Sequence, residues 1–143
     1  MPSSIREQIL ARLQVALAAA SPGNAQVFRS REVSITRSIS PALVIMPQDN
    51  PINQQATMAD KNQLEVALEI FVRGDPWDSL ADAVDVPMHA AIMSDAQLLA
   101  LVARVRRIGE SFNGQEADRT AGTLTVRYLF TYLTNAADIT RAA

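Results

Sequence analysis

Apolar residues recur every fourth position between residues 5 and 17, which is the spacing of one face of an α-helix. Ser4 and Glu7 stand three residues apart at the start of this segment and form a capping-box pattern. Pro22 and the glycine after it cannot prolong a helix. The pattern predicts an amphipathic helix over residues 4–20.

Two later segments alternate apolar and polar residues, which predicts half-buried strands. The first, residues 63–72, is the clearest strand in the chain, and the second, residues 122–138, lies close to the end of the chain. Shorter β-prone runs at residues 27–39, 43–46 and 105–112 predict further strands.

The closing strand has two unequal faces. Its even-numbered residues from Leu124 to Tyr132 are apolar or aromatic and predict a core face. An aromatic stripe on a sheet can also stack bases, but no basic residues interleave on this face. The odd-numbered face begins polar and then carries Leu129 and Leu133. A single buried layer leaves these two leucines in water, so we expect a neighbouring subunit or a loop of the same chain to cover them.

A second helix is predicted after the first of these strands. Asp75 is a favourable N-cap and Pro76 a favourable first helical residue. The apolar stripe of this helix runs from Trp77 to Ile92, and Pro87 predicts a kink or break within it. We expect Trp77 to anchor the helix on the sheet.

Residues 47–62 are polar, contain two prolines and show neither helical nor strand periodicity. They predict a long polar loop, and loops of this length are usually functional or disordered. Its polar side chains are the candidates for partner contact: Gln48, Asp49, Asn50, Asn53, Gln54, Gln55, Asp60 and Lys61.

This order of elements predicts a single α+β domain over residues 1–143. Its sheet is expected to be mostly antiparallel or mixed, with both main helices packed on one face.

Composition excludes several classes of function. The net charge of −2 gives no general attraction to nucleic acid or to an anionic membrane. Cysteine is absent, which excludes disulfides, thiolate catalysis and cysteine metal sites. No apolar run reaches the length of a bilayer span and the first residues lack a signal-peptide pattern, so we expect synthesis in the cytoplasm.

Candidate chemistry is sparse. His89 is the single histidine, so a Ser-His-Asp arrangement would depend on it entirely, and a partly buried, hydrogen-bonded imidazole explains it as well. The five glycines are scattered singly, which leaves no phosphate-cradling loop. We expect no catalytic residue, no metal and no cofactor.

Charged residues form two opposite groups. Four carboxylates step along one face of the second helix: Asp75, Asp78, Asp82 and Asp85. A basic group follows later in the chain: Arg104, Arg106 and Arg107. A divalent-cation site on the acidic face is one interpretation, but such sites usually draw oxygens from convergent loops, so a solvated acidic stripe is favoured. The basic group is too small to indicate nucleic-acid binding.

Several stretches together resemble the tail terminator proteins of long-tailed phages, the lambda-type minor tail proteins. They are the opening helix IREQILARLQVAL, the strand LEVALEIFVRGDPW that passes directly into a helix, the segment RGDPWDSLAD and the closing VRYLFTYLTNAAD. The similarity lies in the order of elements and in the strand ends, and it extends over most of the chain.

The resemblance implies a mixed sheet with helices to one side and a homohexameric ring. Such a ring docks on the last ring of the tail tube protein, stops tube polymerisation, and presents its other face to a neck or head-completion protein. DNA is expected to pass through the ring without sequence-specific binding. The expected location is the head-proximal end of the virion tail, after assembly in the host cytoplasm.

The ring implies subunit contacts. We expect apolar residues on the odd-numbered strand faces to lie under a neighbour, and the acidic stripe of one subunit to meet the basic group of the next. The candidate interface residues are Phe71, Asp78, Asp82, Asp85, Arg104, Arg106, Arg107, Arg127, Leu129 and Leu133.

Three alternatives stay open. The first is a neck or head-tail connector subunit of the same general build. The second is a cytoplasmic dimeric ferredoxin-like module that binds a small ligand between helix and sheet. The third is a hydrolase or metal enzyme that uses His89 with the acidic stripe.

Overall fold

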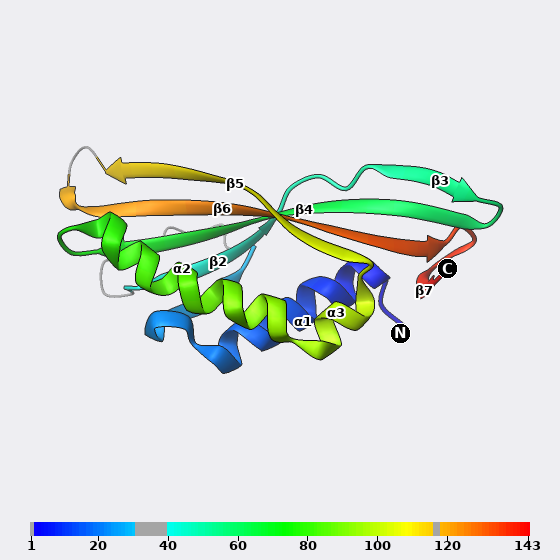
Figure 1. Cartoon of the computed structure of the whole chain (residues 1–143), viewed down its shortest axis with the longest axis horizontal. Coiled ribbons are helices and arrows are strands. Elements are labelled where there is room, and N and C mark those ends of the chain that lie inside the picture. Colours follow the sequence, from blue (N-terminus) through cyan, green and yellow to red (C-terminus); the bar gives the residue numbers. More distant parts are fainter. Residues whose placement is uncertain (1, 31–39, 116–117) are drawn as a thin grey trace.

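A computed structural model describes residues 2–30, 40–115 and 118–143 of the chain (Figure 1). Within these ranges three α-helices lie on one face of a seven-stranded mixed sheet. The predicted α+β class, with the helices on one side of a mixed sheet, is confirmed.

The helical layer comes from two separate parts of the chain. Helix α1 spans Ile5–Ala20 and is followed by the short 3₁₀ helix η1 at Pro22–Asn24, whereas α2 spans Trp77–Ser94 and α3 spans Ala96–Leu101. The Ser4 hydroxyl accepts a hydrogen bond from the Glu7 N–H at 3.1 Å, as the capping-box pattern predicts.

Seven strands build the sheet. They are β1 (Gln26–Arg29), β2 (Ala42–Pro47), β3 (Ile52–Ala56), β4 (Ala59–Arg73), β5 (Arg104–Gln115), β6 (Asp118–Asn135) and β7 (Asp138–Ala142). The central order is β1-β2-β4-β6-β5, while β3 pairs with β4 and β7 pairs with β6. Only β1 and β2 are parallel among these pairs. The predicted strand at 27–39 begins in β1, and its residues 31–39 lie outside the described ranges.

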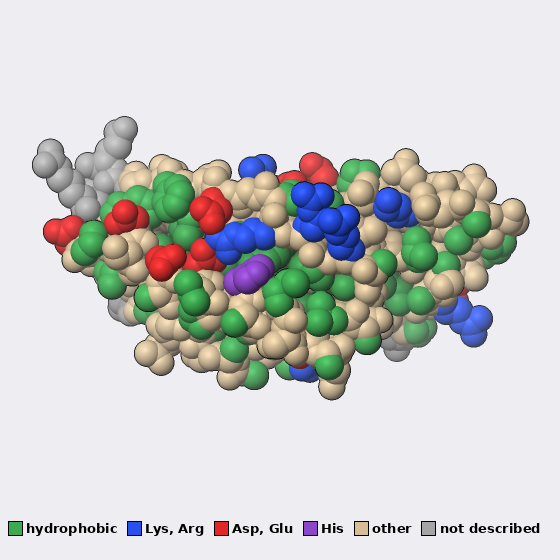
Figure 2. Space-filling view, viewed as in Figure 1, with side chains coloured by type: hydrophobic (Ala, Val, Ile, Leu, Met, Phe, Trp, Pro, Cys, Tyr) green, Lys and Arg blue, Asp and Glu red, His purple; other side chains and the backbone are tan. Residues whose placement is uncertain are grey.

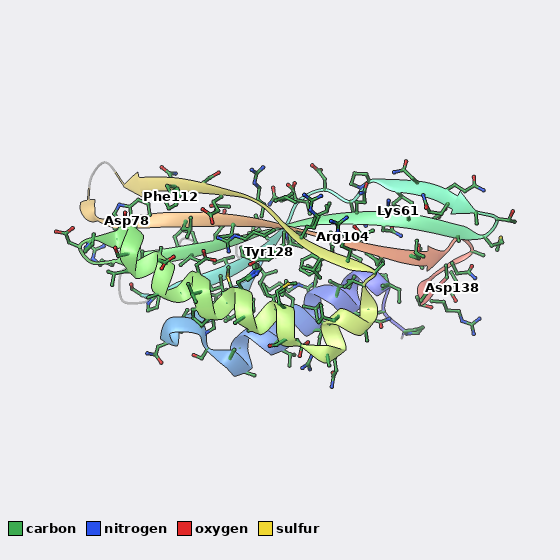
Figure 3. The ribbon with its side chains drawn as sticks, in the orientation of Figure 1. Lys61, Asp78, Arg104, Phe112, Tyr128 and Asp138 are labelled. Atoms are coloured by element: carbon green, nitrogen blue, oxygen red, sulfur yellow. The ribbon has the colours of Figure 1, made fainter. Side chains whose placement is uncertain are left out.

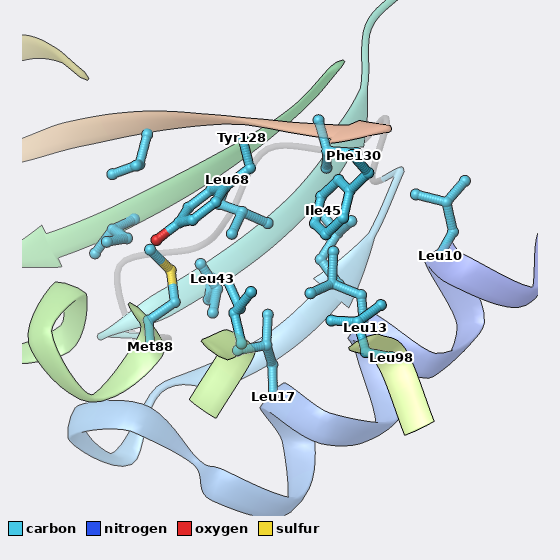
Figure 4. Close-up of a cluster of buried hydrophobic side chains, with 14 of the residues drawn as sticks. Leu10, Leu13, Leu17, Leu43, Ile45, Leu68, Met88, Leu98, Tyr128 and Phe130 are labelled. Carbon is cyan, nitrogen blue, oxygen red and sulfur yellow. The ribbon is translucent and has the colours of Figure 1, made fainter. Parts of the chain in front are cut away.

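The core lies between the helices and the even-numbered face of β4 and β6. Tyr128, Phe130 and Tyr132 are almost fully buried there, together with Leu68 and Met88 (Figure 4). The prediction that the even face of the closing strand is the core face is confirmed.

The predicted long loop at residues 47–62 is wrong for most of its length. Residues 52–56 form β3, which pairs antiparallel with the first residues of β4 and makes a hairpin that turns at Thr57 and Met58. All five residues of β3 are exposed, so neither face needs apolar side chains and no alternation marks the strand. Backbone pairing rather than burial of an apolar face forms this element.

The predicted start of the second helix is also wrong. Pro76, with φ −82° and ψ 130°, is the N-cap of α2, and no side chain caps the helix there. The helix also runs through Pro87 without a break to Ser94. Val84 before the proline and Met88 after it are both buried in the core, and this packing holds both halves of the helix.

Strand β5 contains a register shift between Arg107 and Gly109. Val105 and Arg107 lie opposite even-numbered, core-facing residues of β6 before the shift, and Glu110 and Phe112 do so after it. Simple alternation would have placed Phe112 on the opposite face from Val105. The bulge therefore shifts the alternation by one residue, so that the side chains of Glu110 and Phe112 lie on the helix side of the sheet.

Candidate assembly surface

The sheet is much longer than the helices that cover it. Strand β4 has 15 residues and β6 has 18, so they extend roughly 50 and 60 Å, whereas the 18 residues of α2 rise only about 27 Å. Figure 1 shows β3, β7 and the adjoining ends of β4 and β6 projecting beyond the helices. We call this projection, residues 52–62 and 132–142, the arm.

The arm carries several large apolar side chains in contact with solvent. Ile52, Met58, Leu133 and Ile139 are between 39% and 59% exposed. They come from β3, the hairpin turn, β6 and β7, so each element of the arm except β4 contributes one. Ile52 lies opposite Asn62 and Leu133 opposite Lys61, so these apolar groups lie on both faces of the arm. Exposed apolar groups on a projection are a feature that another protein can cover.

Buried polar contacts fix the base of the arm. Asn62 on β4 donates a hydrogen bond to the Thr134 hydroxyl on β6 at 2.9 Å, and both residues are buried. Asn50 donates to the Tyr132 hydroxyl at 2.9 Å, and burial raises the pKa of this phenol. Because β4 and β6 are also paired along their whole length here, the arm is a positioned extension of the sheet.

The predicted partner-contact residues fall into two groups. Gln48 and Asp49 extend the pairing of β2 with β4, because the Gln48 N–H donates to the Glu65 carbonyl at 2.8 Å and the Glu65 N–H donates to the Asp49 carbonyl at 2.7 Å. Asn50 bonds Tyr132 at the base. The remaining predicted residues lie on the arm itself: Asn53, Gln54 and Gln55 on β3, and Asp60 and Lys61 on β4.

The sheet face away from the helices carries the odd-numbered residues of β4 and β6. Phe71, Arg127 and Leu129 are half-buried on it, and Leu133 is exposed. Arg127 lies across Gly109 of β5, where a Cβ atom would stand 2.3 Å from its Nη2 atom. The structure thus places these four predicted interface residues on one face, as the alternation predicts, but spreads them along its length.

Two of the predicted interface residues bind each other within the chain. The Arg107 guanidinium donates two hydrogen bonds to the Asp85 carboxylate, at 2.7 and 2.6 Å, and it also pairs with Glu110. These carboxylates raise the pKa of Arg107 above its ordinary value, chiefly through the bonds to Asp85. Asp85 is buried. A bulge in β5 and a buried face of α2 bring this pair together within one chain. The expectation that both residues also contact a neighbouring subunit stays a prediction.

His89 has a structural partner next to this pair. Its Nδ1 atom lies 2.7 Å from the Tyr128 hydroxyl, and its ring stacks on the tyrosine ring at a centroid distance of 5.8 Å. Burial raises the pKa of the Tyr128 phenol. The imidazole is half-buried and hydrogen-bonded, so the structural interpretation of this histidine accounts for its environment.

The remaining predicted charges lie at the surface. Asp78 and Asp82 are exposed on α2 beside an open groove of about 310 Å³ between α2 and β5. Arg104 and Arg106 are exposed at the start of β5. Acidic side chains gather near one end of the visible surface and basic ones nearer its middle (Figure 2).

Within the described part of the chain, no group of three or more histidine, cysteine, aspartate or glutamate side chains is arranged to hold a metal ion. None of the described helices has the length and hydropathy needed to cross a bilayer.

Sequence reasoning identified Leu133 but missed the other exposed apolar residues of the arm, Ile52, Met58 and Ile139, and the exposure of Phe112 on β5. Ile52 and Ile139 sit among polar residues and leave no periodic signal. For Phe112 a signal exists: Gly109 interrupts a strand pattern, which is typical of a bulge and reverses the face of every later residue.

No protein-family model matches the chain, and no curated protein matches it either. Function is therefore inferred from the chain's own sequence and geometry.

Proposed function

We propose that the chain is a virion structural protein, a tail terminator that caps the tail tube, stops its polymerisation and provides the surface for head or neck attachment. The observation that carries the proposal is the arm, a fixed four-strand extension that reaches beyond the subunit's own helices and exposes apolar side chains. Such a projection suits contact with another protein better than it suits a monomeric enzyme.

The size of the arm supports this proposal. Burying an isoleucine side chain stabilises an association by about 1.5–3 kcal/mol before the costs of association. Ile52 and Ile139 are 59% and 58% exposed in the single chain, so a partner that covers the arm gains roughly half of this free energy at each site. A ring seated on the end of a tube offers such cover from two directions, the next subunit and the tube itself.

Two of the segments that resemble tail terminators lie where the sheet meets the helical layer and where it continues into the arm. RGDPWDSLAD includes the end of β4 and the start of α2, and VRYLFTYLTNAAD includes most of β6 and the turn that leads into β7. The first segment therefore joins the sheet to its helical layer, and the second ends at the arm. In the proposed ring, a homohexamer, one ring face meets tail tube protein and the other meets a neck or head-completion protein, with no catalytic step and no cofactor.

A neck or head-tail connector subunit is the nearest alternative, since the arm suits it equally. The ferredoxin-like alternative is less favoured. In the described residues the chain begins with a helix and places four strands before α2, which differs from the βαββαβ order of that fold. The enzyme alternative requires His89, and among the described residues its side-chain hydrogen bond goes to the Tyr128 hydroxyl and not to a carboxylate or a serine.

Electron microscopy of the purified protein mixed with tail tubes tests the proposal. We expect a ring at one end of each tube and an arrest of further tube growth. Filled heads in place of tubes provide the control, because a connector binds heads rather than tubes. Indifference to tubes, or binding to heads alone, would overturn the terminator assignment.

A further inference from the structure

We infer that the groove between α2 and the free edge of β5 is a docking site for a second copy of this chain, which inserts Arg104 and Arg106. This inference rests on the proposed function, since it specifies how subunits of the ring meet. It commits the groove to one occupant, the start of strand β5 of the neighbouring subunit.

Strand β5 is a long unpaired edge of the sheet. Its 12 residues pair with β6 on one side, and no described strand pairs with the other side. Charges and bulges protect open edges from pairing with another strand, and β5 has both, with a bulge before Gly109 and exposed Arg104, Arg106 and Glu110. The contact is therefore argued from side chains of this edge and not from strand pairing. This edge also exposes apolar surface, because Phe112 is 62% and Ile108 is 38% exposed.

The groove beside this edge is acidic with one aromatic wall. Seven residues line it: Asp78, Ser79, Asp82, Asp85, Glu110, Phe112 and Leu124. Arg107 already neutralises part of this charge through Asp85 and Glu110. Four carboxylates against one guanidinium leave three negative charges, and neither Asp78 nor Asp82 has an ion-pair partner among the described residues.

The complementary basic patch lies elsewhere on the same chain. Arg104 and Arg106 stand opposite Thr131 and Leu129 of β6, which places them on the sheet face away from the helices. Both side chains are exposed, and neither has a carboxylate partner in the described ranges. Figure 3 labels Asp78 and Phe112 near one end of the sheet and Arg104 nearer its middle.

The two patches lie on opposite faces of β5 and at different points along it, and they form no ion pair within one chain. A contact that joins one patch to a different patch on the next copy is heterologous, and such contacts build closed rings when the rotation closes. Guanidinium groups can bond carboxylates in a bidentate geometry and stack on an aromatic ring, so Asp78, Asp82 and Phe112 together suit an arginine. Because each subunit carries both patches, copies of this chain alone satisfy both of them once the ring closes.

Charge reversal with a mixing step tests the contact. One variant carries Arg104→Glu and Arg106→Glu, and the other carries Asp78→Arg and Asp82→Arg. Each variant alone brings like charges together, so we expect the concentration needed for self-association to rise at least tenfold in native mass spectrometry and sedimentation. An equimolar mixture is expected to restore association at low salt, because each patch then meets its opposite charge on the other variant.

A control reverses one exposed charge away from both the groove and the arm, with Arg6→Glu. This control is expected to associate like the natural chain, and circular dichroism melting confirms that each variant is folded. If either charge-reversed variant alone associates like the natural chain, or if the mixture of the two fails to associate, the inference is overturned.

Crosslinking extends the test to a chain that is monomeric at working concentrations. Because the protein has no cysteine, Asp82→Cys and Arg106→Cys place one thiol in each patch without a competing thiol. We expect oxidation of the mixed variants to give mainly the Asp82→Cys to Arg106→Cys dimer, and little of either homodimer. If the natural chain is monomeric and the two cysteine variants show no preference for the mixed dimer, the docking site is contradicted.

The two proposals fail in distinguishable ways. If the docking site is wrong but the function is right, the natural protein caps tubes and the Arg104→Glu, Arg106→Glu variant still forms complete rings. If the function is wrong but the docking site is right, mixing restores association in solution and tubes stay uncapped.

Discussion

At the scale of single residues, the contact of Trp77 with β6 is the tightest constraint on the helix-sheet interface. A Cβ atom at Gly122 would lie 2.2 Å from Cδ2 of the indole ring, so only glycine fits beneath the tryptophan. Gly114 on the neighbouring strand also faces the indole, but a Cβ atom there would lie 3.5 Å from Nε1, which is ordinary contact.

We therefore expect Gly122→Ala to lower the free energy of unfolding by about 2 kcal/mol, as other overpacked sites do. Gly114→Ala is the matched control and is expected to change it by less than about 0.5 kcal/mol. Urea denaturation followed by tryptophan fluorescence measures both, since Trp77 is the single tryptophan. Equal effects of the two alanines would show that the indole does not set the requirement for glycine.

Some of these residue-level contacts were predictable from the sequence. The even face of β6 and the anchoring role of Trp77 follow from alternation and from the position of the tryptophan at the start of a helix. The pairing of Asp85 with Arg107 does not follow, because it depends on the bulge in β5 and on which face of α2 is buried. Sequence periodicity does not show which residue of a helix lies beside which residue of a strand, as with Asp85 and Arg107, which are 22 positions apart.

At the scale of elements, Asp95 joins the two parts of the helical layer. Its carboxylate accepts the Leu98 N–H at 2.9 Å as the N-cap of α3, and it also accepts two hydrogen bonds from Arg12 of α1, both at 2.8 Å. The bond to Arg12 is the main reason that the pKa of Asp95 lies below its ordinary value.

This lowered pKa predicts a pH dependence of stability. The folded chain favours the ionised form of Asp95, so its contribution is fully present above the ordinary carboxyl pKa of about 3.9 and is lost as pH falls through the lower folded pKa. Asp95→Asn keeps a side chain that can cap α3 and removes the charge. We expect thermal melts to show a constant destabilisation of this variant between pH 5 and pH 7 that shrinks below pH 4.

Asp95→Ala separates the cap from the ion pair. It loses both, so we expect it to be less stable than Asp95→Asn by about 1 kcal/mol at neutral pH. A difference between Asp95→Asn and the natural chain that stays constant down to pH 2 would mean that the charge of Asp95 contributes nothing to stability.

Elements with an apolar face were predictable, and elements without one were not. Helix α1 and strands β4 and β6 each bury a periodic set of side chains, so the sequence pattern located them. Strands β3 and β7 form because backbone groups of β4 and β6 pair with them, and their side chains are mostly exposed. Register and pairing are long-range properties, which is why the 47–62 segment was predicted as a loop.

At the scale of the whole molecule, the sheet extends beyond the helices that cover it. This extension links the fold to the proposed assembly. The even-numbered face is covered as far as the base of the arm, where Asn62, Tyr132 and Thr134 are buried. Beyond the base, exposed apolar groups belong to β3, β6, β7 and the hairpin turn. The sequence indicated that the chain has surplus apolar residues, at Leu129 and Leu133, but it did not indicate the projection that carries Ile52 and Ile139. That projection appears only when the lengths of strands and helices are compared in one structure.

The arm predicts that binding and stability can be separated. Ile52 and Ile139 are 59% and 58% exposed, so Ile52→Thr with Ile139→Thr is expected to change the free energy of unfolding by less than about 0.5 kcal/mol per site while weakening tube capping about tenfold or more. Val15 and Val86, which are 52% and 63% exposed on the helices, give the matched control Val15→Thr with Val86→Thr. This control is expected to leave both quantities unchanged. Denaturation curves measure stability, and the fraction of capped tubes at increasing protein concentration, counted by electron microscopy, measures binding. If the helix variant lost capping and the arm variant kept it, the partner would contact the helical layer and the arm would have no part in assembly.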